Sequence, residues 1–138
     1  FDLDLAVRED SENPVYYVQY AHARICSLVA RLAEEGAAVP AAADVDASIF
    51  TTPEEKALVK NLAQLPEEIH LAVRDYDPSH INRYLLALAG DFHRFYNACY
   101  IRGEAPEVLS ARLKLADTVR LVIANCLALI GVNAPEKM

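Results

Sequence analysis

One helical row of the sequence combines aromatic rings with positively charged guanidinium groups. Tyr17, Tyr20, Arg24, Leu28 and Arg31 follow one another at intervals of three or four residues, so they share one face of a helix. Such a face can stack on unpaired nucleobases and bind phosphate or a base edge. Tyrosines at the edge of a helix also occur as ordinary packing residues. The spacing alone leaves both interpretations of the row open.

Groups for catalysis or metal binding are scattered along the chain. The sequence contains no glycine-rich phosphate loop, no His-Glu-x-x-His motif and no nucleophile elbow. The nearest approaches to a metal motif are Glu67-x-x-His70, Asp77-x-x-His80 and Asp91-x-His93. A di-iron bundle needs two Glu-x-x-His pairs and two further glutamates, and only one such pair is present. We predict no catalytic residue and no metal site, and we interpret His22, among the apolar residues of its helix, as structural.

The three cysteines, Cys26, Cys99 and Cys126, form no Cys-x-x-Cys pair. This spacing argues against a disulfide framework or a zinc knuckle. Free cysteines at apolar helix positions are usually small hydrophobic residues. We therefore expect a reducing, cytoplasmic environment.

The net charge of −7 is unevenly distributed. Residues 1–12 and 34–77 carry net charges of −4 and −7, whereas residues 13–33 and 78–138 each carry +2. An acidic protein does not have the overall charge of a nucleic-acid-binding protein, but one end of this chain can still be locally basic. A mosaic surface with no binding role explains the same distribution, and we expect the acidic 34–77 segment to face away from any RNA.

Prolines and glycines divide the chain into about five helices. Asn13-Pro14 places a capping residue before a proline, and Thr52-Pro53-Glu54-Glu55 has the spacing of a capping box. The glycines Gly36, Gly103 and Gly131 follow periodic segments, where helices commonly end. The predicted helices span 14–35, 53–65, 66–76, 78–101 and 106–130, with a short helical turn near 46–49. No segment has a sustained period of two, so the predicted fold class is an all-α helical bundle.

The faces of the last two helices differ in character. The 106–130 helix is apolar nearly all round, which predicts that it is the central, most enclosed helix. On the 78–101 helix, we expect Tyr84, Tyr96 and Tyr100 to lie near the polar edge.

The length of 138 residues and the apolar content of 54% suit one folded domain, which we place at 13–138, after a lead-in or linker at 1–12. The longest strongly apolar stretch, 121–132, is too short to cross a membrane. Because the chain starts at Phe1 without an initiating Met, we treat it as a fragment of a longer protein.

The segment Asn13-Pro-Val-Tyr-Tyr-Val-Gln-Tyr-Ala-His-Ala-Arg24 closely resembles the opening helix of the C-terminal anticodon-binding (DALR-type) domain of arginyl-tRNA synthetases. The resemblance extends through Phe95-Tyr96 to the closing Ala134-Pro-Glu-Lys-Met138 and covers essentially the whole chain. Lys137 stands where the family often has arginine, and Cys126 where glycine is frequent. The resemblance implies that the anticodon loop of arginine tRNA is contacted by Tyr17, Tyr20, Arg24, Tyr96 and Met138.

The same resemblance implies a place in protein biosynthesis. These synthetases are class I ligases that use ATP with Mg²⁺ on a separate catalytic domain. Neither His-Ile-Gly-His-like nor Lys-Met-Ser-Lys-Ser-like signatures occur here, so we expect no catalysis and no cofactor in this chain. The expected partners are arginine tRNA and the catalytic domain of the same enzyme, with no DNA or membrane. The alternative is a helical interaction module that docks on the catalytic domain or on another synthetase.

Overall fold

The computed structural model describes residues 2–10 and 12–138, and this part of the chain contains helices and no strand. Its elements are α1 (Leu3–Ala6), α2 (Pro14–Glu34), the 3-10 turns η1 (Ala42–Asp44) and η2 (Ala47–Ile49), α3 (Pro53–Ala63), α4 (Leu65–Arg74), α5 (Ser79–Ala98) and α6 (Pro106–Leu129). The all-α prediction and the five long helices are confirmed, each starting within one residue of the predicted position. The predicted turn near 46–49 is η2. None of the helices in the described residues is long and apolar enough to span a membrane.

The starts of α2 and α3 follow the local capping signals. The side chain of Asn13 accepts hydrogen bonds from the first turn of α2, at 3.1 Å from the Val15 amide nitrogen. At the start of α3, Thr52 and Glu55 form the predicted capping box, in which each side chain accepts a hydrogen bond from the other residue's backbone. These contacts satisfy amides that have no partner inside the helix.

Two helices end on a glycine in the left-handed conformation. Gly36 and Gly131 have φ values of 89° and 73°. The amides of Ala37 and Val132, one residue further on, donate to the carbonyls of Leu32 and Leu127, at 2.9 Å in both cases. This is the hydrogen-bonding pattern that stops a helix and reverses the chain, and it favours glycine because other residues are strained there.

The central helix is α5, which packs against α2, α3, α4 and α6. The prediction that the last helix is the central one was wrong, because α6 packs mainly against α2 and α5, whereas α5 contacts all four other long helices. The prediction that Tyr84 lies at a polar edge was also wrong. Tyr84 is 5% exposed, and its hydroxyl donates to the Asn61 carbonyl of α3 at 3.2 Å. A phenol with an internal partner can be buried at little cost, so polarity did not reveal its position.

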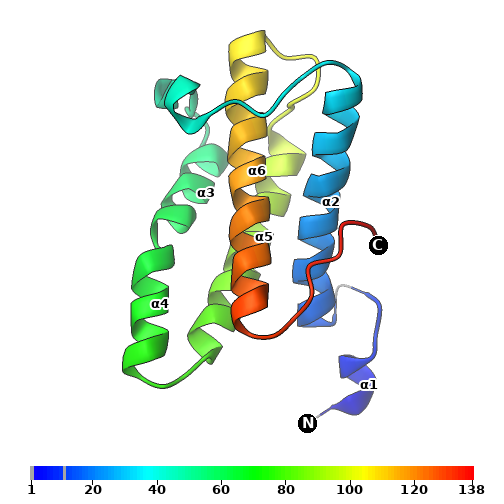
Figure 1. Cartoon of the computed structure of the whole chain (residues 1–138), viewed down its shortest axis with the longest axis vertical. Coiled ribbons are helices and arrows are strands. Elements are labelled where there is room, and N and C mark those ends of the chain that lie inside the picture. The colour runs from blue at the N-terminus through cyan, green and yellow to red at the C-terminus, as the bar shows by residue number, and fades with distance from the viewer. Residues whose placement is uncertain (1, 11) are drawn as a thin grey trace.

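Figure 1 shows α3 and α4 on one side of the bundle and α2 on the other, with the C-terminal tail running beside α2. The tail is held there by side chains of α2. The Gln19 amide donates to the Asn133 carbonyl at 2.8 Å, and His22 Nδ1 donates to the Pro135 carbonyl at 2.9 Å. His22 is buried, which confirms its structural interpretation. The tail therefore has a fixed position on the α2 face.

The described residues of the segment before α2, 2–10 and 12, lie outside the core. The segment contains the single turn α1, in which no residue is buried. The Asn13 side chain links this segment to α2 by donating a hydrogen bond to the Arg8 carbonyl at 2.8 Å.

The three cysteines are free: Cys99 and Cys126 are buried and Cys26 is half-buried.

Candidate nucleic-acid interface

A hollow of about 480 Å³ lies between α2, the second half of α5 and the C-terminal tail. We call it the first hollow. Its lining residues are Tyr20, Ala23, Arg24, Ser27 and Arg31 of α2, Tyr96 of α5, and Lys137 and Met138 of the tail. Four of the five site residues predicted from the sequence therefore lie around one space, although they come from three separate segments.

The Arg24 guanidinium is held in place by two contacts with α5. Its Cζ atom lies 4.0 Å from the centre of the Tyr96 ring, which is a cation–π contact. Its Nη1 atom donates to Nδ1 of His93 at 3.3 Å. A guanidinium carries five N–H groups, so most of them are not used by this hydrogen bond. Arg24 is thus an oriented donor at the wall of the first hollow.

His93 belongs to this site, although no motif in the sequence assigned it there. Its ring lies 5.0 Å from the ring of Tyr17 and 5.9 Å from that of Tyr20, nearly parallel to the latter. Burial, with the neighbouring Arg24 charge, lowers the pKa of His93 below its ordinary value. The ring is therefore neutral at pH 7, with Nδ1 free to accept from Arg24. The feature of the sequence that could have assigned His93 to the site is its position three residues before Tyr96, which puts both rings on one face of α5.

Under this arrangement His93 Nε2 carries the proton. Nε2 is buried and has no hydrogen-bond partner among the described residues.

The Asp91-x-His93 pair does not form a set of metal ligands, because the Asp91 carboxylate pairs with Arg94 and accepts a hydrogen bond from the Asn61 amide at 2.7 Å.

The two tyrosines of the predicted row have different surroundings. Tyr20 is 44% exposed and lines the first hollow. Tyr17 is half-buried, packs against His93 and does not line the hollow. Leu28, from the same row, is buried in the core. The row is therefore exposed only in part, and Tyr17 packs against the His93 ring without lining the first hollow.

The charge around the first hollow is positive. Arg24, Arg31 and Lys137 line it, whereas Glu67 and Glu68 belong to α4, which lies with α3 on the opposite side of the bundle (Figure 1). The beginning of the acidic segment departs from this separation. Glu35, just after α2, pairs with Arg102 at 2.8 Å between Oε1 and Nη2.

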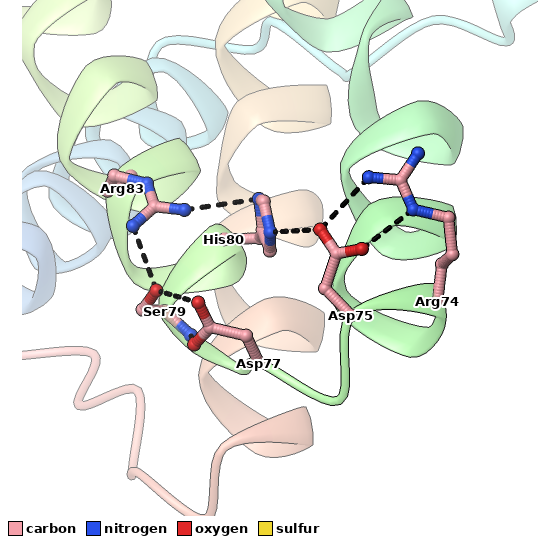
Figure 2. A network of polar contacts seen from close by, with 6 residues as sticks. All are labelled: Arg74, Asp75, Asp77, Ser79, His80 and Arg83. Carbon is pink, nitrogen blue, oxygen red and sulfur yellow. Dashed lines mark hydrogen bonds and ion pairs between the residues drawn. The ribbon is translucent and has the colours of Figure 1, made fainter.

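A separate cluster of charged groups lies at the turn between α4 and α5, and its members form hydrogen bonds and ion pairs with one another (Figure 2). Asp77 accepts from the amide and hydroxyl of Ser79 at 2.9 and 2.8 Å, and these hydrogen bonds lower the pKa of its carboxyl. His80 Nε2 donates to Asp75 at 3.0 Å, and Arg83 Nη2 donates to His80 Nδ1 at 3.1 Å. Asp77 and His80 therefore contact Ser79 and Asp75, respectively, and both stabilise the turn. In residues 2–10 and 12–138, no three acid, histidine or cysteine side chains are grouped so that they could hold a metal ion.

Comparison with known proteins adds the family context. Residues 18–138 match the model of the DALR anticodon binding domain. Over all 138 residues, the chain is 48% identical to the arginine–tRNA ligase of Ruminiclostridium cellulolyticum and 49% identical to that of Acetivibrio thermocellus. It also superposes along its whole length on the solved arginyl-tRNA synthetase of Thermus thermophilus, with a TM-score of 0.83 and 29% identity, and covers 23% of that chain. The chain spans about a quarter of the length of the curated relatives, 24% in both cases.

Proposed function

The chain belongs to the DALR anticodon-binding domain family, and we propose that it binds the anticodon loop of arginine tRNA as part of a cytoplasmic arginine–tRNA ligase. The ATP-dependent ligation, with its Mg²⁺, takes place in a separate catalytic region of such an enzyme. The observation that carries the proposal is the first hollow, in which two tyrosines, two arginines, a lysine and a methionine from three segments surround one space.

Each side chain has a chemical role in this proposal. Tyr20 and Tyr96 offer rings on which splayed loop bases stack. Arg24, held by Tyr96 and His93, donates to a base edge, while Arg31 and Lys137 bind phosphate. Lys137 supplies charge without the two-pronged geometry of arginine, so its contact carries little sequence information.

The contribution of Met138 is steric. Its side chain is 50% exposed at the end of the tail, beside the first hollow. A flexible thioether fills irregular gaps against an aromatic or base surface. Tyr17 acts on the RNA indirectly, because it packs on His93 and does not line the first hollow.

A second candidate function is supported by a small apolar surface near the start of α2. A shallow hollow there is lined by Val15 of α2, Leu86 of α5 and Ile130 after α6, and Val15 and Leu86 are 45% and 36% exposed. Exposed apolar side chains beside a hollow lose their contact with water when another protein covers them, which favours association. We propose that this surface docks on the catalytic domain of the same enzyme, which is compatible with RNA binding at the first hollow.

The test of the proposed function is a binding titration of the 138-residue chain with two stem-loop RNAs. One carries an arginine anticodon, and the other carries the same loop with its central anticodon base changed. Tyr20→Ala should weaken binding of the arginine loop by about 1–3 kcal/mol, the usual contribution of one base–aromatic stack. The control is Tyr76→Ala, which removes a tyrosine that is 95% exposed at the α4–α5 turn.

The salt dependence provides a second measure. Of the three cations at the first hollow, Arg31 and Lys137 are assigned to phosphate, and each phosphate contact on a single strand contributes about 0.7 to the slope of log K against log salt, so the magnitude of the slope should be about 1.4. Equal affinity for the two loops, or equal effects of Tyr20→Ala and Tyr76→Ala, would refute the assignment of base recognition to this chain.

A further inference from the structure

Next to the first hollow lies a second one of about 250 Å³, and the two share Arg31 and Tyr96. We call it the second hollow. It lies between the end of α2 and the chain that follows α5. Its floor is apolar and consists of the buried side chains Leu28, Leu32, Cys99 and Ile101.

The rim of the second hollow carries an exposed aromatic ring. Tyr100 is 76% exposed and follows the last residues of α5. Its backbone is fixed by Arg112 of α6, whose Nη1 donates to the Tyr100 carbonyl and whose Nε donates to the buried carboxylate of Glu55 at 2.7 Å. A large apolar ring on a fixed backbone loses little freedom when it packs against a ligand.

Of the two arginines that line the second hollow, only Arg31 is in a position to bind a phosphate. Arg102 also lines the second hollow, but its charge is offset by Glu35 at 2.8 Å. Arg31 has no ion pair among the described residues and borders both hollows. A phosphate joining two nucleotides, one in each hollow, would lie within the field of Arg31.

From these features we propose that the second hollow is a second nucleotide subsite for the same single-stranded RNA loop. The base next to the one in the first hollow stacks on Tyr100, and Arg31 binds the phosphate between them. This inference rests on the proposed function. Because the floor of the second hollow is apolar, it holds any base by its face and adds affinity without discrimination.

The experiment measures binding of stem-loop RNA carrying an arginine anticodon to the 138-residue chain and four variants. Tyr100→Ala should weaken binding about 5- to 150-fold, the usual range for one base stack, while Tyr100→Phe keeps the ring and binds like the unmodified chain. Tyr20→Ala reports on the first hollow, and Tyr76→Ala is the control for loss of an exposed tyrosine. Thermal unfolding of each variant checks that the fold is retained.

RNAs with a single abasic site then locate the contact. For one loop position, removal of the base should weaken binding to the unmodified chain but not to Tyr100→Ala, since the two changes remove the same contact. That position should adjoin the one that is coupled to Tyr20 in the same way. Exchanging one base for another at the Tyr100-coupled position should change affinity less than removing it.

The outcomes distinguish the two proposals. If Tyr20→Ala weakens binding but Tyr100→Ala behaves like Tyr76→Ala, the second subsite is refuted and the proposed function stands. If Tyr100→Ala weakens all abasic loops equally, no base stacks on Tyr100 and the subsite is again refuted. If neither tyrosine matters, the proposed function fails together with the subsite.

Discussion

Exchanging Arg24 and Arg31 one at a time should separate recognition of a base edge from binding of phosphate. Arg24 is oriented by Tyr96 and His93, whereas Arg31 is exposed and has no ion pair among the residues described. An oriented planar fork suits a base edge, and a free cation suits a phosphate. We therefore expect Arg24→Lys to reduce sequence discrimination and Arg31→Ala to reduce only the ionic part of binding.

The expected magnitudes follow from these contacts. The guanidinium of Arg24 uses one N–H for His93, which leaves enough donors for a bidentate contact, a contact that is commonly worth about 1–3 kcal/mol of discrimination against the wrong base. Lysine keeps the charge but not the fork, so Arg24→Lys should lose most of that discrimination while the salt slope stays unchanged. Arg31→Ala should lower the slope of log K against log salt by about 0.7, the value for one phosphate on a single strand.

The assay is a set of binding titrations at several salt concentrations, with the arginine loop and with the loop whose central anticodon base is changed. Two variants and two RNAs give the discrimination and the slope for each side chain. The reasoning would be refuted by the reverse pattern, in which Arg24→Lys lowers the slope and keeps the discrimination. It would also be refuted if Arg31→Ala abolished discrimination.

Two further predictions concern His93 and the buried Glu55–Arg112 pair. Burial and Arg24 lower the pKa of His93 in the folded chain. As the pH falls through about 6.5, the His93 ring is therefore protonated in the unfolded chain but not in the folded one, so the free energy of unfolding decreases between about pH 6.5 and the lowered pKa. His93→Asn should flatten that part of the stability curve, as measured by urea unfolding at several pH values, and an unchanged pH dependence would contradict the buried neutral ring. Burial raises the pKa of Glu55, but hydrogen bonds from Thr52 and Arg112 lower it more, so its contribution to stability is present above about pH 4.3 and is lost as the pH falls through its lowered pKa. Glu55→Gln removes the buried charged partner of Arg112 and leaves it only the partly exposed Glu104 at 3.8 Å, so it should reduce the free energy of unfolding at pH 7 by about 3–5 kcal/mol. The exposed Glu67→Gln should change it little, and similar losses for both would contradict a buried ion pair.

The positions of the helices were predictable because their signals are local. Asn13 and the Thr52–Glu55 box act on amides within one turn, and Gly36 and Gly131 adopt backbone angles that other residues avoid. Such effects depend on a few neighbouring residues. The sequence therefore determined where each of the long helices starts and, within three residues, where it ends.

The order of burial depended on which helices meet. Apolar content pointed to α6 as the central helix, but α5 is the one that contacts all four other long helices. Tyr84 could be buried because Asn61 of α3 supplies an acceptor for its hydroxyl. Neither fact can be obtained from the periodicity of one segment.

The candidate site divides in the same way. The spacing of Tyr20 and Arg24 put them on one face of α2, and the family resemblance indicated Tyr96 and Met138. The tertiary structure alone placed His93 between the two helices and joined the two hollows at Arg31 and Tyr96. The physical reason is range: caps, turns and periodicity act within about one helical turn, whereas a binding site is made by side chains that only the packing of distant segments brings together.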